Sequence, residues 1–202
     1  MDISSIILAG GKSVRLGHDK VIERLGNKTL LEKVISRIDS FSHEIVIVTA
    51  EKRDFSHLSG NTKIRTVSDI FPGRGSLGGI YTGLVKSESF YNLVIAADMP
   101  FLNQKLLTYM IEVADGFDYV IPRINQYYEP LHAIYSKNCS SPIETMLNQN
   151  VRVIVELFNY VKVRFVEAEE IDRFDPEHLS FFNINTEEDL ELARKIESGI
   201  KE

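Results

Sequence analysis

The sequence predicts a three-layer α/β/α fold around a mostly parallel, mixed sheet of the Rossmann-like type. Two observations carry this prediction. Segments rich in β-branched residues alternate with segments of helical periodicity over the first half of the chain, which is the pattern of βαβ units. The chain has 202 residues, enough for one domain with a buried core, and no Pro/Gly/Ser-rich linker or internal repeat divides it. We therefore expect a single domain over residues 1–202.

In the first half of the chain, strands and helices alternate in order. A continuous apolar run opens the chain and predicts a buried strand, and the later strands are short runs of Val, Ile and Thr. The helices have apolar residues at helical spacing, and the second follows a glycine-rich loop. The predicted elements are strand 3–9, helix 29–38, strand 44–49, strand 63–68, helix 77–86 and strand 92–97.

The second half is less regular. The predicted elements are helix 104–114, strand 117–122, strand 130–136, helix 140–147 and helix 186–197. Thr186 is an expected N-cap with Asp189 completing a capping box, and Pro142 falls in a first helical turn, where its missing N–H costs little. Residues 151–158 fit a strand by their valines and a helix by their spacing, and the acidic stretch 167–175 is expected to form a solvated face.

Composition excludes several classes of protein. Lys and Arg number 23 against 29 Asp and Glu, a net charge of −6, so the chain is not a basic nucleic-acid binder. Cys139 is the single cysteine, which excludes an intrachain disulfide and fits a reducing compartment. The apolar run 6–9 is too short for a membrane span and lacks the basic flank of a signal peptide. We expect a cytoplasmic protein that binds neither membrane nor nucleic acid.

The first chemical motif is the loop that follows the opening strand, residues 8–20. Glycines let a backbone approach a phosphate closely and turn its N–H groups toward it. Arg15 and Lys20 add positive charge to this loop. It is not a P-loop, because a Walker pattern ending at Ser13 would need glycine where Ile6 stands. A solvated loop with no ligand is the alternative.

Two further motifs follow predicted strands. Asp69 precedes a loop in which Gly73, Gly75 and Gly78 satisfy G-x-G-x-x-G, a weak dinucleotide-binding signal because the loop does not follow the first strand. Asp98 ends a hydrophobic strand and begins the string Asp-Met-Pro-Phe. A carboxylate at that edge suits Mg²⁺, which takes one or two protein carboxylates together with nucleotide phosphates. A helix-capping role for Asp98 is the alternative.

Taken together, these motifs resemble those of the molybdenum cofactor guanylyltransferases, the MobA-like nucleotidyltransferases. The resemblance is strong to about residue 102 and thinner beyond it. The pattern L-A-G-G-x-S-x-R-x-G-x-D-K is matched by Leu8, Ala9, Gly10, Gly11, Ser13, Arg15, Gly17, Asp19 and Lys20. The other matching strings are the Asp69 loop with its G-S-L-x-G, the Asp98 string, Glu129-Pro130-Leu131-His132-Ala133 and Phe182-Asn183-Ile184-Asn185-Thr186.

The resemblance implies a Rossmann-like nucleotidyltransferase fold and a reaction. GMP is transferred from GTP to the phosphate of the molybdopterin cofactor, and pyrophosphate is released. Residues of about 1–102 would bind the nucleotide and about 103–202 the acceptor. The implied catalytic residues are Arg15, Lys20 and Asp98, with Asp98 holding Mg²⁺. The implied nucleotide-binding residues are Leu8, Ala9, Gly10, Gly11, Ser13, Lys20, Asp69 and Asp98, and the implied acceptor-binding residues are Gly78, Asn183 and Asn185.

Alternatives stay open at this point. A relative that uses CTP, or a sugar or alcohol phosphate as acceptor, fits the same motifs. A nucleotide- or dinucleotide-binding regulatory module is the alternative outside enzymes. Thr49 stands where many relatives have an asparagine near the nucleotide, and Asn183 and Asn185 fit turn or capping roles equally well. The resemblance also leaves room for transient contact with proteins that deliver the cofactor or accept the product.

Overall fold

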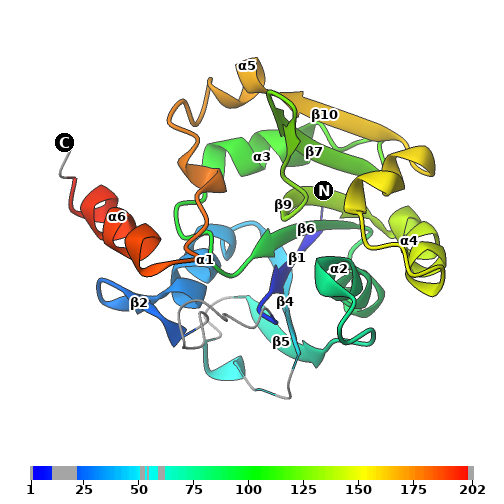
Figure 1. Ribbon diagram of the computed structural model, residues 1–202, viewed down its shortest axis with the longest axis horizontal. Coiled ribbons are helices and arrows are strands. Elements are labelled where there is room, and N and C mark those ends of the chain that lie inside the picture. The colour runs from blue at the N-terminus through cyan, green and yellow to red at the C-terminus, as the bar shows by residue number, and fades with distance from the viewer. Residues whose placement is uncertain (1, 11–21, 51–52, 54, 59–61, 200–202) are drawn as a thin grey trace.

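A mixed β-sheet runs through the middle of the molecule, and helices cover both of its faces (Figure 1). The computed structural model describes residues 2–10, 22–50, 53, 55–58 and 62–199. The strands of the main sheet are β1 (Ile3–Leu8), β4 (Ser42–Thr49), β5 (Lys63–Ser68), β6 (Tyr91–Ala96), β7 (Tyr119–Ile124), β8 (Tyr127–Tyr128), β9 (His132–Ser136) and β10 (Val163–Glu167). Their order is β10-β7-β9-β6-β1-β4-β5, with β8 paired to β7, and only β8 and β9 run against the others.

The helices divide between the two faces. The α-helices are α1 (Leu30–Ile38), α2 (Gly75–Lys86), α3 (Gln104–Glu112), α4 (Ser140–Asn148), α5 (Ala168–Ile171) and α6 (Glu187–Ser198). One core lies between the sheet and α1, α3 and α5, and a second lies between the sheet and α2 and α4. Helix α6 packs beside the small hairpin of β2 (Arg24–Leu25) and β3 (Lys28–Thr29), at the left of Figure 1. Among the described residues, no helix is both long and apolar enough to cross a lipid bilayer.

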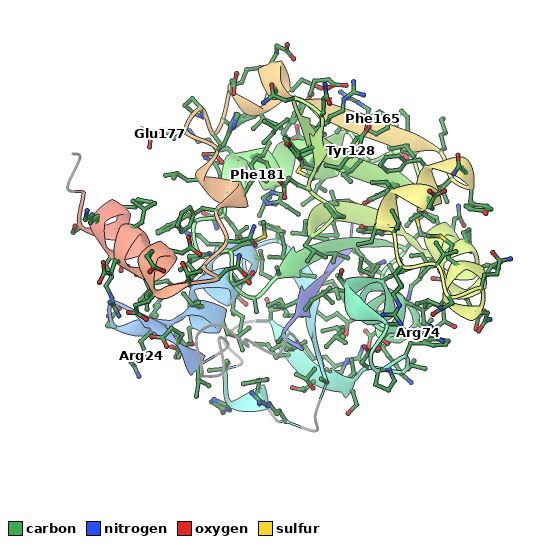
Figure 2. All side chains as sticks on the ribbon, in the orientation of Figure 1. Arg24, Arg74, Tyr128, Phe165, Glu177 and Phe181 are labelled. Atoms are coloured by element: carbon green, nitrogen blue, oxygen red, sulfur yellow. The ribbon has the colours of Figure 1, made fainter. Side chains whose placement is uncertain are left out.

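The predicted three-layer fold is confirmed. The small hairpin of β2 and β3 was not predicted, and the other main differences lie in the second half of the chain. Residues 151–158 form neither a strand nor an α-helix. From Ile154 onward the chain forms the 3-10 helix η4 (Ile154–Asn159). The acidic stretch 167–175 is not a solvated face: Ile171 is fully buried. Glu167 is paired with Arg123 through bonds of 2.9 and 2.5 Å. The Arg123 guanidinium lies over the ring of Phe165, and that ring packs against the ring of Tyr128 (Figure 2). Strand β10 was not predicted. It lies at the edge of the sheet and pairs with β7, a distant segment, so its sequence alone gives little sign of a strand.

Helix α2 lies close to strand β1. A Cβ atom added at Gly83 would stand 2.3 Å from Cγ2 of Ile6, and one added at Gly79 would stand 3.1 Å from Cδ2 of Leu8. The two glycines are one helical turn apart and therefore face the same strand. Their missing side chains set the distance between the helix and the sheet.

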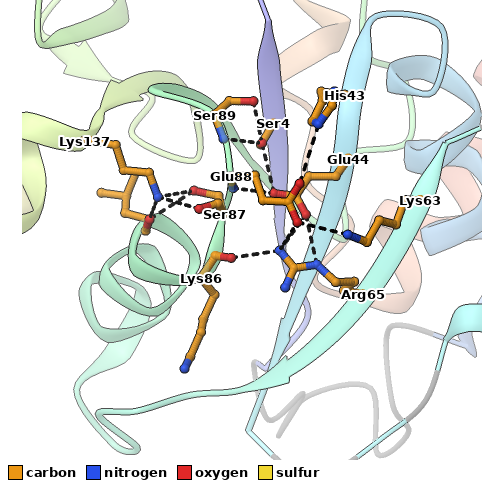
Figure 3. Close-up of polar contacts among 11 residues, drawn as sticks. Ser4, His43, Glu44, Lys63, Arg65, Lys86, Ser87, Glu88, Ser89 and Lys137 are labelled. Atoms are coloured by element: carbon orange, nitrogen blue, oxygen red, sulfur yellow. Dashed lines mark hydrogen bonds and ion pairs between the residues drawn. The ribbon is translucent and has the colours of Figure 1, made fainter.

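The amino edge of the sheet is held by a buried carboxylate, shown in Figure 3. Glu44 has no exposed surface. Its Oε2 accepts two bonds from the guanidinium of Arg65, of 3.0 and 2.6 Å. Its Oε1 accepts from the Ser4 hydroxyl at 3.2 Å and from the Glu88 backbone N–H at 2.5 Å. A buried charge is tolerated when such partners satisfy it, so this cluster fastens β1, β4, β5 and the connection after α2 to one another.

A histidine is buried on the face of the sheet that α1, α3 and α5 cover. His132 begins β9, has no exposed surface, and its ring lies 4.7 Å from that of Phe181. Burial lowers the pKa of His132 to about 4, because the charged imidazolium is removed from water, and the Asp175 carboxylate nearby offsets only part of this effect. His132 is therefore neutral in the folded protein near pH 7, as a packed residue rather than a ligand.

We expect Gly83→Ala to destabilise the protein by about 1–3 kcal/mol, because its methyl group would overlap Ile6. Denaturant unfolding measures the change. At an open helical position the same substitution raises stability by about 1 kcal/mol, because alanine is the better helix former. A stabilised Gly83→Ala variant would therefore contradict the close packing.

We expect His132 to make the fold sensitive to acid. The folded-state pKa of about 4 lies below the ordinary value of 6.5. The contribution of neutral His132 to the free energy of unfolding is fully present above pH 6.5. It is lost as the pH falls toward 4, a decrease of about 3 kcal/mol in all. Unfolding free energies of the wild type and His132→Leu, measured from pH 7 to 4, should differ in slope. His57→Gln, which alters an exposed histidine, should keep the wild-type slope, and equal slopes in all three proteins would contradict the assignment.

Candidate functional site

A cavity of about 620 Å³ opens at the carboxyl edge of four neighbouring strands, β1, β4, β5 and β6. Ligands of open α/β sheets bind at this edge. The described residues that line it are Leu8, Ala9, Gly10, Val48, Thr49, Ala50, Asp69, Pro72, Gly73, Gly75, Ser76, Gly79, Ala96, Ala97, Asp98, Leu131, Asn183 and Asn185. Most are small or apolar, and two carboxylates and two amides stand among them, which suits a ligand that has both flat apolar and polar parts.

The end of β1 forms the floor of this cavity and is locked between its two neighbours. The Ala9 N–H donates to the carbonyl oxygen of Val48 at 2.8 Å, and the Ala97 N–H donates to that of Leu8 at 3.1 Å. A Cβ atom on Gly10 would stand 3.1 Å from the backbone nitrogen of Ala50. Glycine is thus favoured at position 10 by the close approach of β4, and the backbone there is held in place for contact with a ligand.

Asp69 follows β5 and is firmly oriented. Its backbone N–H donates to the Thr49 carbonyl oxygen at 2.9 Å. Its Oδ1 accepts from the Phe71 N–H and from the Thr82 hydroxyl, both at 2.9 Å. Both side-chain bonds therefore fall on one oxygen, which leaves Oδ2 for a ligand in the cavity.

The segment before α6 closes the cavity from the far end of the chain. The backbone N–H of Ile184 donates to the carbonyl oxygen of Asp98 at 3.0 Å. Ile184 is fully buried in the small core under α6. Because side chains alternate along an extended segment, its neighbours Asn183 and Asn185 face the other way, and both line the cavity.

The same segment ends in the predicted capping box. Thr186 is the N-cap of α6 and its hydroxyl accepts from the Asp189 N–H at 3.1 Å. The Asp189 carboxylate accepts in return from the N–H groups of Thr186 and Asn185, at 2.9 and 2.8 Å. The backbone of Asn185 is therefore fixed by the helix that follows it.

The structure brings most of the predicted site residues together. Those that line the cavity are Leu8, Ala9, Gly10, Asp69, Asp98, Asn183 and Asn185. The predicted residues Gly11, Ser13, Arg15 and Lys20 lie outside the described residues. Gly78 is not among the lining residues: a Cβ atom there would meet the Phe71 carbonyl oxygen at 2.8 Å, which gives glycine a packing reason, and its acceptor role stays a prediction.

Other lining residues were missed by sequence reasoning. Gly79 and Ser76 belong to the first turns of α2, and Leu131 precedes β9. Their positions in the sequence, next to the glycine-rich loop and to a predicted strand, were the feature that could have marked them as site residues. Arg74 lies between two lining glycines, but its guanidinium donates to the Asn150 side chain beyond α4 (Figure 2).

A divalent cation is compatible with this edge. Asp98 offers a hard oxygen donor there, directly after β6. The described part of the chain contains no cluster of three or more histidine, cysteine or acidic residues able to hold a metal. A single carboxylate at this edge is compatible with Mg²⁺ shared with the phosphates of a nucleotide, an arrangement usual for that ion.

The model of the MobA-like NTP transferase domain matches residues 5–163. The chain belongs to the MobA-like NTP transferase family. The match includes the ends of β1, β4, β5 and β6, and so the greater part of the cavity. The family predicted from the sequence motifs, and with it a nucleotidyltransferase, is confirmed.

MobA-like relatives cover nearly the whole chain. A probable molybdenum cofactor guanylyltransferase of Natranaerobius thermophilus is 38% identical over 197 residues, 96% of each chain. A molybdenum cofactor guanylyltransferase of Desulfosudis oleivorans is 37% identical over 201 residues, 98% of this chain and 96% of the relative.

Solved structures agree on the fold. Molybdopterin-guanine dinucleotide biosynthesis protein A of Archaeoglobus fulgidus is 31% identical, with a TM-score of 0.83 over 98% of this chain and all of the other. A cytidylyltransferase of Thermus thermophilus, acting on 2-C-methyl-D-erythritol 4-phosphate, has a TM-score of 0.71 over 97% and 98% of the two chains. At 16% identity, the second likeness concerns the fold alone.

Proposed function

We propose that this MobA-like protein is a molybdenum cofactor guanylyltransferase, which transfers GMP from GTP to the phosphate of the molybdopterin cofactor. The observation that carries the proposal is the convergence of Leu8–Gly10, Asp69 and Asp98 on one cavity. Relatives 37–38% identical over nearly the full chain bear the name of this activity. The cytidylyltransferase structures, at 16–20% identity, share the fold and carry no argument for the CTP-using alternative.

In this proposal the nucleoside lies against the end of β1. The backbone groups of Leu8, Ala9 and Gly10 pair with the edge of the guanine, and Asp69 accepts a hydrogen bond from the nucleoside. A fixed backbone and an oriented carboxylate support these roles, because pre-organised groups lose little entropy when a ligand binds. Gly11 and Ser13 contribute to the same nucleotide-binding loop.

The transfer itself needs positioning and neutralisation of charge rather than a protein nucleophile. An oxygen of the acceptor phosphate bonds to the α-phosphorus of GTP, the bond to the bridging oxygen breaks, and pyrophosphate leaves. No general base is required, since a phosphate monoester is largely ionised near pH 7. Arg15 and Lys20 balance the charge of the triphosphate and of the leaving pyrophosphate.

Asp98 holds Mg²⁺ in this proposal. When bound, the ion supplies positive charge to the phosphate oxygens. Asn183 and Asn185 orient the acceptor, as amides that both donate and accept hydrogen bonds. A cytoplasmic location and transient contacts with proteins that deliver the cofactor or accept the product complete the proposal.

The proposal is tested by the nucleotide that purified protein uses. Transfer to molybdopterin is followed by pyrophosphate release with GTP, ATP and CTP, and binding of these and of NAD by calorimetry. We expect GTP to be favoured by about 30-fold or more, because a wrong base leaves two buried polar groups unpaired, each costing ~1–3 kcal/mol. A preference for CTP would assign a sister activity, and tight NAD binding that is lost on mutating Gly75 would overturn the proposal.

Asp98→Asn tests the metal role, because the amide keeps the shape of the side chain and removes its charge. We expect turnover to fall by about 100-fold or more, with part of the loss recovered at high Mg²⁺. Asp115→Asn, at an exposed carboxylate away from the cavity lining, is the matched control and should retain wild-type turnover. Wild-type turnover in Asp98→Asn at ordinary Mg²⁺ would exclude the role.

A further inference from the structure

One buried hydroxyl outside the cavity lining bears directly on the site. Thr82 lies on α2 and has no exposed surface. Its Oγ1 donates to Oδ1 of Asp69 at 2.9 Å and accepts from the backbone N–H of Ile70, also at 2.9 Å. The hydroxyl therefore uses its single proton on Asp69, and its direction is fixed by the N–H that it accepts.

The reach of this hydroxyl depends on how closely α2 lies to the sheet. A threonine side chain is short, so the helix must come near the strand ends for Oγ1 to meet a residue that follows β5. Gly79 and Gly83, on either side of Thr82, give the helix that approach to β1. The glycine positions and Thr82 thus form one arrangement within a single turn of α2.

The Asp69 side chain would otherwise turn about its χ angles. Without Thr82, the Phe71 N–H would be the one remaining donor to Oδ1 among the described residues. A single donor does not fix the plane of the carboxylate. Two donors on one oxygen fix both the rotamer and the direction of the other oxygen. A carboxylate accepts hydrogen bonds and does not donate them, so Oδ2 selects a donor on the ligand.

We propose that Thr82 is a positioning residue that turns Oδ2 of Asp69 toward an N–H or O–H donor of the bound nucleoside. The inference rests on the proposed function, because it takes Asp69 to contact the nucleotide. The donor is a guanine N–H or a ribose hydroxyl, which share this chemistry. GTP, inosine triphosphate, which lacks the exocyclic amine, and 2′-deoxy-GTP distinguish these sources.

Thr82→Val keeps the branched shape and removes the hydroxyl, and Thr82→Ser keeps the hydroxyl. We expect the Kd for GTP, measured by calorimetry, to rise about three- to tenfold in Thr82→Val and to stay within about twofold in Thr82→Ser. In an Asp69→Ala background, Thr82→Val should add less than about twofold, because the two residues act through one contact. Thr82→Ala replaces the valine variant if the latter does not fold.

Thr62→Val is the matched control. Thr62 is nearly buried, and its hydroxyl donates to the Asp39 carbonyl oxygen at 2.8 Å, away from the cavity lining. We expect this variant to lose stability and to keep the wild-type Kd. Thermal unfolding of every variant separates a loss of stability from a loss of binding.

An unchanged Kd in Thr82→Val, or an equal loss in the presence and absence of Asp69, would overturn the proposal. If the wild type prefers another nucleotide, the proposed function fails, and the same series measured with that nucleotide still decides the role of Thr82. The donor is the one whose removal, in inosine triphosphate or in 2′-deoxy-GTP, abolishes the effect of Thr82→Val. An effect that persists with both analogues assigns the donor to the guanine N1–H or the ribose 3′-hydroxyl, which both analogues retain, and still supports the proposal.

Discussion

The closeness of α2 to β1 is the constraint on which the site depends. Two missing side chains, at Gly79 and Gly83, let the helix lie against Leu8 and Ile6. Interiors are close-packed, so such a distance cannot be relaxed locally without moving the whole helix. The glycine-rich loop before α2 would move with it. The glycine-rich wall and the orientation of Asp69 therefore both depend on the packing of this one helix against the floor of the cavity.

The two edges of the sheet handle charge in opposite ways. At the amino edge, Glu44 is enclosed by Arg65 and by neighbouring donors, and its charge is satisfied within the protein. At the carboxyl edge, Asp69 lines the cavity and both of its side-chain hydrogen bonds within the protein fall on one carboxylate oxygen. The amino edge thus satisfies its buried charge within the protein, whereas the carboxyl edge keeps one carboxylate oxygen for a ligand.

The sequence predicts elements well where their signal is local. Helix periodicity, the capping box at Thr186 and the carboxylates after β5 and β6 are all readable within a few residues. Elements that depend on a distant partner are harder to predict. Strand β10 pairs with β7, and Glu167 with Arg123, across 44 positions. Thr82 carries no signal at all as a site residue, because its relation to Asp69 exists only once α2 is packed.

The cavity is completed by residues that are far apart in the chain. Its floor and its two carboxylates belong to the first hundred positions, whereas the Ile184 bond to Asp98 brings in Asn183 and Asn185 from beyond position 180. A ligand in the cavity therefore contacts two distant parts of the chain, and its binding favours the docked position of the segment before α6 over an undocked one.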